Sequence, residues 1–512
     1  MGGTLFAVVA LVVFYGFTLA LALGLALVPP IVLAAALVIG IRVPIYALIL
    51  PFPFCWIPAY LLAEAVLTAK RRPFVAPGPL LREAEFPLLF AELRSLAGAA
   101  GVAVPEQVYV THDGDAYVTE LPGRQGRVLV LGCVVFEAFT LAELRAIVAH
   151  ELAHFALGHT AYSGLRGHTW ALFSSMAVGV ERPNFSAHWS TEAGTAIGRT
   201  LVSGLLKAYA WLYLRATLPG ARRQELAADG MAARIAGKQA VASALTKVAS
   251  TFPIYDFFWE NEVAPLVAKG VAPRDFLAGF ARAREGYRER GLERELADAV
   301  QSQRTRAFDT HPALTDRLAY VAREDAVESV DGGSEPAHCL LGDDVEALPV
   351  RVLERTPRAH ELVLYTYQEL EQGYIPRTLY DEAQKLSAKL YLMFPRATTL
   401  SAMLATVVEL AQAGRFMECA HQWLPSLNQP MPPQARHAAV AQLWYNVLST
   451  LAQGVLVERG ATVDSNLGRS SFRLTLAGAS YLPGDVAHAA ATGDRAALAT
   501  LRTWAEVSVV PS

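Results

Sequence analysis

The sequence predicts a mainly α-helical protein of the α+β class, with membrane-spanning helices at the N-terminus and a small β-sheet inside a helical globular domain. Three observations lead to this prediction. They are an uncharged apolar run over residues 4–28, three short β-type segments followed by a well-marked helix, and a C-terminal part rich in Ala and Leu with helical periodicity. Of the 512 residues 53% are hydrophobic and 18% charged, which is typical of a chain that lies partly in lipid.

Charge and cysteine content exclude several classes of function. Lys and Arg number 44 and Asp and Glu 47, so the formal net charge is -3. No global positive field attracts phosphate backbones, and we expect no nucleic-acid partner. The four cysteines lie far apart without a CxxC pair, which argues against a disulfide framework and a thiolate zinc site.

Residues 1–72 are predicted to form a membrane-spanning segment of about two helices. The run 4–28 is longer than the roughly 20 residues that cross a bilayer. A secretory signal is the alternative, but the run has no basic flank before it and is followed by more apolar sequence. A second span is expected between residues 31 and 67. Basic residues at 70–72 follow at once, which favours a cytoplasmic location for the domain that comes next.

Residues 73–323 are predicted to be the globular domain. Its first part is expected to contain a helix over residues 86–96 and strands over 108–111, 116–121 and 127–131, with turns between them as hairpins need. A further helix begins after Thr140, where Thr140 and Glu143 fit a capping box and Phe139 and Leu144 a hydrophobic staple. An i, i+4 apolar stripe predicts that this helix packs in the core.

An HExxH motif lies on this helix, at His150, Glu151 and His154. Two histidines four residues apart project from one side of a helix and can bind one metal ion, while the glutamate between them reaches a water molecule at the metal. The alternative is a pair of buried histidines with structural hydrogen bonds. A catalytic zinc site also needs a third protein ligand and an open fourth position.

A second helix, ending near Gly237, offers that third ligand. Glu225 and Asp229 share one of its faces, so Glu225 is a candidate ligand and Asp229 a candidate acceptor for the free N–H of a ligand histidine. In the alternative interpretation both acids face solvent or pair with Arg222 and Arg223.

With these residues the sequence resembles the HtpX-like and CAAX-prenyl-protease-like membrane zinc metallopeptidases, which are gluzincins with HExxH and a downstream ExxxD. Three segments carry the resemblance, namely 149–154 with Gly158 and His159, 225–229, and 310–312 with Arg317. The resemblance implies a gluzincin-type helical protease domain that binds Zn²⁺ through His150, His154 and Glu225.

The resemblance also implies roles for the neighbouring residues. Glu151 is the general base and Asp229 supports a ligand, while His311 lies near the site, where it helps the oxyanion, and Arg317 supports the site. His159 has an equal alternative, an interaction with the terminal carbonyls of its helix, and His311 has the alternative of a loop or cap residue. Many members carry an Asn-Ala pair before HExxH, whereas this chain has Asp115-Ala116, so the contact made by that asparagine is in question here.

Two features between and after the ligand helices bear on the membrane. Residues 169–180 and 200–217 are apolar but short, and we interpret residues 169–217 as a membrane-associated hairpin or a cover over the active site, with two full spans as the alternative. The aromatic group at 252–259 is most simply a core cluster, with a substrate cleft or the bilayer surface as alternatives.

The C-terminal part is predicted to be separate. Residues 324–349 are acidic and contain a Gly-Gly-Ser stretch, which is typical of a linker. Residues 350–512 are predicted to form a helical module resembling tetratricopeptide repeats, without a catalytic cluster and with a protein partner as one candidate role.

The predicted function is that of an integral-membrane zinc metalloendopeptidase, in the bacterial inner membrane with a cytoplasmic catalytic domain, acting on unfolded or membrane-protein segments in quality control. Residues 127–131 are expected to be the sheet edge to which a substrate adds. One alternative is a narrow-specificity processing protease, and another is a non-catalytic membrane scaffold with a helical partner-binding domain.

Overall fold

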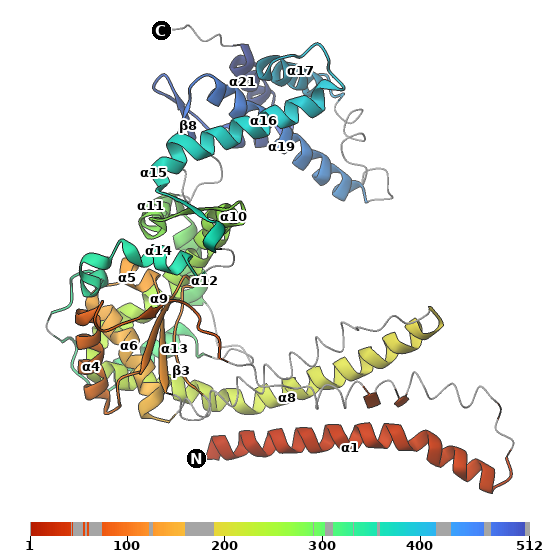
Figure 1. Ribbon diagram of the computed structural model, residues 1–512, viewed down its shortest axis with the longest axis vertical. Helices are drawn as coiled ribbons and strands as arrows, with labels where there is room; N and C mark the ends of the chain where they lie inside the picture. Colours follow the sequence, from red (N-terminus) through yellow and green to blue (C-terminus); the bar gives the residue numbers. More distant parts are fainter. Residues whose placement is uncertain are drawn as a thin grey trace. The chain divides into compact units, whose positions relative to one another are not determined.

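The computed structural model describes residues 2–41, 44, 55–56, 59–60, 74–121, 126–158, 189–289, 291–302, 311–330, 332–355, 359–415, 432–464 and 473–506. It is mainly helical with small sheets, which confirms the predicted fold class (Figure 1). The chain divides into two compact units, the first made of residues 1–251 and 298–344 and the second of residues 252–297 and 345–512.

Helix α1 (Gly2–Val38) opens the first unit. It continues through Pro29 and Pro30, which lie between the two expected spans. A proline inside a helix removes one backbone hydrogen bond, but the helix can continue beyond it with a kink. Within the described residues, one helical stretch, Gly16–Val38, is long and apolar enough to cross a membrane. Of residues 31–67, where the second span was expected, residues 31–38 belong to α1 and most of the others lie outside the described residues.

The first unit contains a four-stranded sheet. Its strands are β1 (Leu80–Leu81), β2 (Gln107–Thr111), β3 (Ala116–Glu120) and β4 (Arg127–Gly132). The order is β1-β2-β4-β3, with β2 parallel to β4 and β3 antiparallel to it. The three predicted strands are thus confirmed, but the expected hairpin between β2 and β3 is wrong because β4 lies between them.

The same order corrects the expected substrate edge, since β4 is an interior strand and β3, its neighbour, lies at an edge of the sheet. The physical reason is that residues 128–131 are apolar without alternation and completely buried, as a strand covered on both faces must be.

Helices pack around this sheet. They are α4 (Pro87–Ala100), α5 (Val134–Ala138), α6 (Leu141–Ala156), α8 (Trp189–Ala236), α9 (Lys238–Phe258, which reaches into the second unit) and α13 (Leu314–Arg323), with the 3₁₀ segment η3 (Ala337–Asp344). The predicted segment 200–217 lies within α8, whereas residues 169–180 lie outside the described residues.

Part of the predicted acidic linker packs against α6. The backbone N–H of Leu141 donates to Glu335, that of Ala142 donates to Gly333, and Thr140 forms a β-bridge with Pro336. These bonds use N–H groups of the first turn of α6, which have no partner inside the helix. The division into a domain of residues 73–323 and a module of residues 350–512 stays a prediction.

The second unit begins with the aromatic group of the sequence. Tyr255 and Phe258 are fully buried, and their rings contact Phe280 edge-to-face and at a tilt, as in a core cluster. The elements around it are η2 (Trp259–Val263), α10 (Ala264–Ala268), β5 (Val271–Pro273), α11 (Phe276–Glu289), α12 (Leu292–Ser302), α14 (Ala347–Leu353), η4 (Ala359–Glu361), β6 (Val363–Tyr365), α15 (Tyr367–Glu369) and η5 (Leu370–Tyr374).

The C-terminal part of this unit combines helices with a small sheet. The helices are α16 (Ile375–Tyr391), α17 (Leu400–Gln412), α19 (Pro433–Glu458), α20 (Pro483–Ala491) and α21 (Arg495–Glu506). The antiparallel strands β7 (Thr462–Asp464), β8 (Arg473–Leu476) and β9 (Ala479–Tyr481) were not expected. Residues 416–431 lie outside the described residues, and the resemblance of this module to tetratricopeptide repeats stays a prediction.

Candidate metal centre

Helix α6 carries the HExxH motif, and its start is fixed by the expected capping box. The Thr140 side chain accepts a hydrogen bond from the Glu143 N–H, and the Glu143 carboxylate accepts one from the Thr140 N–H. The predicted stripe, Leu144, Val148, Leu152 and Phe155, is buried. Packing of this stripe leaves the histidines on the adjacent face, where they meet α8.

Helix α8 packs against α6 through small side chains. Ala221, Ala228 and Ala232 are buried, and residues of this size let two helices approach closely. Glu225 and Asp229 are one helical turn apart on the same face and are buried as well. The local sequence therefore brings two carboxylates against the two histidines.

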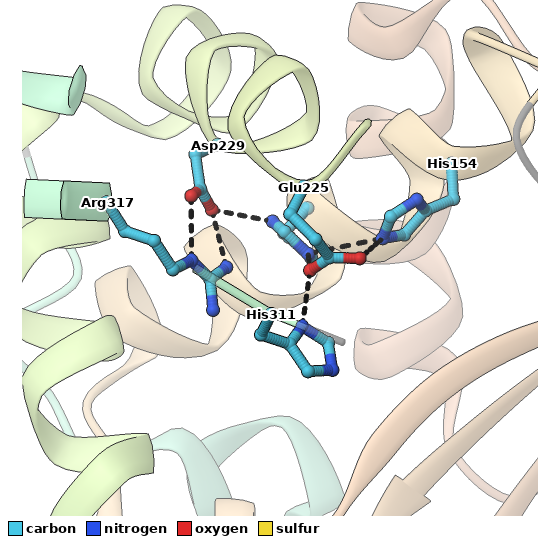
Figure 2. Close-up of polar contacts among 6 residues, drawn as sticks. His154, Glu225, Asp229, His311 and Arg317 are labelled. Atoms are coloured by element: carbon cyan, nitrogen blue, oxygen red, sulfur yellow. Dashed lines mark hydrogen bonds and ion pairs between the residues drawn. The ribbon is translucent and has the colours of Figure 1, made fainter. Parts of the chain in front are cut away.

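The predicted ligand side chains converge (Figure 2). Nε2 of His150 lies 3.2 Å from Nε2 of His154. The two oxygens of Glu225 lie 3.7 Å from Nε2 of His150 and 3.8 Å from Nε2 of His154. Donor atoms of His150, Glu151 and His154 also lie within 4.8 Å of one another. The imidazoles of His150 and His154 and the carboxylates of Glu225 and Glu151 thus surround a common point.

Asp229 links His150 to Arg317. Oδ1 of Asp229 lies 2.9 Å from Nδ1 of His150, while Nε and Nη2 of Arg317 donate to Asp229 at 2.8 and 2.7 Å. Burial raises the pKa of Asp229, but the guanidinium of Arg317 and the imidazole of His150 outweigh burial and hold this pKa below its usual value. Asp229 is therefore a charged, completely buried carboxylate.

His311 contacts the site from the loop before α13. Its Nδ1 lies 2.7 Å from Oε2 of Glu225, although 62% of its side chain is exposed. Burial raises the pKa of Glu225, but the imidazoles of His150 and His311 outweigh burial and lower it. Glu225 therefore carries a negative charge at neutral pH, as a metal ligand must.

The protonation of His150 and Glu151 follows from their surroundings. Burial lowers the pKa of His150, yet the carboxylates of Asp229 and Glu225 raise it to about 10. Burial raises the pKa of Glu151 to about 8, helped by the charges of Glu225 and Asp115 and opposed by His150 and Arg317. Metal binding at His150 would release a proton, because only the neutral imidazole is a ligand.

The donor set fits a zinc ion. Two nitrogens at 2.0–2.1 Å from one tetrahedral centre are about 3.3–3.4 Å apart, close to the 3.2 Å between the two histidines. Two imidazoles with one carboxylate are ligands that zinc accepts, and three protein ligands leave one position open. Glu151 lies beside this group without being needed as a fourth ligand.

His150, Glu151, His154, Glu225, Asp229, His311 and Arg317, all selected from the sequence, meet in this site. His159 lies outside the described residues, so its role stays a prediction. Asp115, noted only as a departure from a family pattern, is close enough to raise the pKa of Glu151. Its position directly before a strand was the available signal.

Comparison with known proteins agrees with this geometry. Residues 83–325 match the sequence model described as Peptidase family M48. Protease HtpX from Hahella chejuensis is 26% identical over 250 residues, which cover 47% of this chain and 73% of that protein. The Protease HtpX homolog from Thiobacillus denitrificans is 27% identical over 240 residues, covering 45% of this chain and 69% of that protein.

A third relative matches a shorter part of the chain. The Protease HtpX homolog from Nitrosomonas eutropha is 26% identical over 169 residues, covering 31% of this chain and 56% of that protein. No solved structure matches the chain significantly. The matched segment contains every residue of the converging group described above. Residues 83–325 are therefore similar to Peptidase family M48, and the relatives that match this part of the chain are HtpX proteases.

Proposed function

We propose that the protein is a membrane-anchored, zinc-dependent endopeptidase. The observation that carries this proposal is the convergence of His150, His154 and Glu225 beside Glu151. Three ligands with an adjacent carboxylate suit a catalytic site better than a structural one, which usually has four protein ligands. His150, His154 and Glu225 would hold the ion, and Asp229 would orient His150.

The chemistry divides between the ion and the side chains. A bound zinc ion would supply Lewis-acid polarisation of the attacking water and of the scissile carbonyl. The Glu151 carboxylate would take a proton from that water as it attacks, and would then deliver the proton to the leaving amine nitrogen as the peptide C–N bond breaks. His311 would hold Glu225 in place and help to stabilise the oxyanion.

Strand β3 is the proposed binding edge for the substrate. It pairs with β4 on one side and contacts α6, the helix of the HExxH motif. An extended peptide can add to such an edge by backbone hydrogen bonds. This mode favours unfolded or exposed polypeptide segments, because a folded substrate has no free strand to offer.

The proposed membrane location depends mainly on Gly16–Val38, an apolar stretch of which few residues are buried. Exposed apolar residues over this length are typical of a span in lipid. We place the catalytic unit in the cytoplasm, from the basic residues at 70–72, and assign the protein to quality control of membrane and unfolded proteins in the bacterial inner membrane. The C-terminal helices are a candidate surface for a protein partner.

Glu151→Gln tests the proposal on the purified full chain. The variant should keep its zinc and lose casein cleavage by about a thousandfold or more, because it removes the proton carrier and no ligand. His150→Ala should lose zinc as well as activity, which provides the matched comparison. If Glu151→Gln cleaved casein at the wild-type rate, Glu151 would have no part in the mechanism. If the wild type bound zinc but did not cleave casein, the non-catalytic scaffold or the narrow-specificity processing protease would be favoured.

A further inference from the structure

The C-terminal end of α8 presents a second face, next to the one that carries its two acids. Gly230, Arg234 and Gly237 recur there at helical spacing. A Cβ added at Gly230 would lie 2.8 Å from Cδ of Glu324, and one added at Gly237 would lie 3.1 Å from Cα of Ser329. The two glycines therefore let the segment that follows α13 lie directly against the backbone of the helix.

Hydrogen bonds hold this segment in place. Nη1 of Arg234 donates to Oε2 of Glu324 at 2.6 Å. The N–H groups of Lys238 and Gln239 donate to the carbonyl oxygens of residues 327–328 at 3.0 and 2.9 Å. Both N–H groups belong to the first turn of α9 and have no acceptor inside that helix. The Glu324 side chain is 17% exposed and that of Arg234 52%, so solvent screens this ion pair in part. The segment, and Glu324 with it, is thus attached to the junction of α8 and α9.

Helix α13 is consequently attached to α8 at both of its ends. Arg317, near the start of α13, donates to Asp229 at 2.8 and 2.7 Å. Glu324 follows the last residue of α13 and donates its N–H to the carbonyl of Val321, so its position depends on that of the helix. One attachment would leave α13 free to turn about that point, whereas two attachments fix its angle to α8. The contact at Glu324 therefore limits the positions that the guanidinium of Arg317 can take.

We propose that Glu324 is a positioning residue for the metal centre. It acts through α13, because its contact with Arg234 keeps Arg317 bonded to Asp229. Asp229 in turn orients His150 through Nδ1. The inference rests on the proposed function, since the site that Glu324 supports is the proposed zinc site. Loss of the Glu324 contact leaves the two Arg317 hydrogen bonds possible but lowers the fraction of molecules that form them. Its effect is therefore smaller than that of removing the Asp229 carboxylate itself.

The test is Glu324→Ala in the purified full chain, with zinc affinity measured by competition with a chelator. The affinity should fall by about three- to tenfold, less than the roughly 10- to 100-fold usual for a direct partner of a ligand, because one attachment of α13 remains. In the Asp229→Asn background the same change should cause little further loss, since the route through Asp229 is already interrupted. Melting temperatures of the zinc-free variants separate this effect from a general loss of stability.

Glu328→Ala is the matched control. The Glu328 carboxylate belongs to the same segment and lies 2.7 Å from Nζ of Lys238, so this pair attaches the segment to α9 and not α13 to α8. The variant should keep wild-type zinc affinity.

Three outcomes would overturn the inference. Glu324→Ala could leave zinc affinity unchanged, whatever its melting temperature; Glu328→Ala could weaken zinc binding as much; or Glu324→Ala could have its full effect in the Asp229→Asn background. In each case cleavage that depends on Glu151 would still support the peptidase, whereas a wild type that binds no zinc would contradict the proposed function itself.

Discussion

Asp229 uses the same oxygen toward two partners, since Oδ1 accepts a hydrogen bond from Nη2 of Arg317 at 2.7 Å and lies 2.9 Å from Nδ1 of His150. A histidine held in this way keeps its other ring nitrogen aimed at the point where Glu225 and His154 meet. The arrangement makes the orientation of His150 depend on α13, which carries Arg317 and supplies no proposed metal ligand.

Asp229→Asn should weaken zinc binding by about 10- to 100-fold while the fold persists, because the amide is a poorer partner for both His150 and Arg317. Competition with a chelator measures the change. Asp316→Asn, beside Arg317 on α13, is the control and should have little effect. Equal zinc affinities in the two variants would mean that Asp229 does not support the site.

Glu225→Ala should remove zinc together with activity, because it deletes one of three proposed ligands. Metal analysis of the purified variant provides the measurement, with circular dichroism to verify that its helical content is unchanged. If Glu225→Ala bound zinc with wild-type affinity, the third ligand would have to be another residue, and His159 would be examined first.

His311→Ala should reduce zinc affinity by about tenfold, since it removes the partner 2.7 Å from Oε2 of Glu225. His360→Ala is a suitable comparison because the His360 side chain is 83% exposed and lies in the second unit. Chelator competition on both variants decides the point. An affinity for His311→Ala that matches His360→Ala would argue against an orienting role.

Glu143 should make the stability of the first unit depend on pH. Its carboxylate accepts hydrogen bonds from Ser243 at 2.5 Å, Lys247 at 2.7 Å and the Thr140 N–H at 2.8 Å. Burial raises the pKa of Glu143, but these partners lower it below 4.5 overall. A lowered folded-state pKa gives stabilisation that is complete above the unfolded-state pKa and is lost as the pH falls through the folded-state value.

Glu143→Gln should therefore lower the melting temperature at pH 7 and make less difference near pH 3. We expect a loss of about 1 kcal/mol at pH 7, because Lys247 is 37% exposed and solvent screens part of its attraction. Thermal unfolding of the full chain at both pH values is the measurement. The exposed Glu346, changed to Gln, should show no such pH dependence, and a constant difference at Glu143 would exclude the linkage.

Cysteine labelling can test the proposed orientation of the chain in the membrane. With a cytoplasmic catalytic unit, a single cysteine placed at Arg82 should react with an impermeant thiol reagent only after the cells are opened. The background for this experiment is a chain whose own cysteines are changed to Ser, and a cysteine on the periplasmic side of a known membrane protein is the positive control. Efficient labelling of intact cells would reverse the proposed topology.

The catalytic helices could be predicted because their signals are local. The capping box at Thr140 and Glu143, the apolar stripe of α6 and the four-residue spacings of its histidines and of Glu225 and Asp229 are all within one or two helical turns. Such spacings fix which side chains share a face. A supporting role for Arg317 was expected only from the family resemblance, and its pairing with Asp229 was not predicted, since 88 residues separate the two.

The order of the sheet depends on pairing between distant residues, and it was predicted wrongly. The expected antiparallel pairing of β3 with β4 is confirmed. The expected hairpin between β2 and β3 is wrong, because β2 pairs in parallel with β4 instead. The continuous apolar run of β4 was a usable signal for an interior strand. Strands β8 and β9 had a weaker signal in the sequence. The turn between them consists of Ala477 and Gly478, both with positive φ, and alanine is not a typical residue for such a turn.

The unbroken course of α8 from Trp189 to Ala236 fixes a rotational phase between its two halves. Trp211 and Leu212 are exposed on the N-terminal half, whereas Glu225 and Asp229 are buried against α6 on the C-terminal half. An insertion of one residue between them would turn one half by about 100° relative to the other. The direction in which Trp211 and Leu212 point is thus coupled to the direction in which Glu225 and Asp229 point. Rotation of one half of α8 would rotate the other half with it.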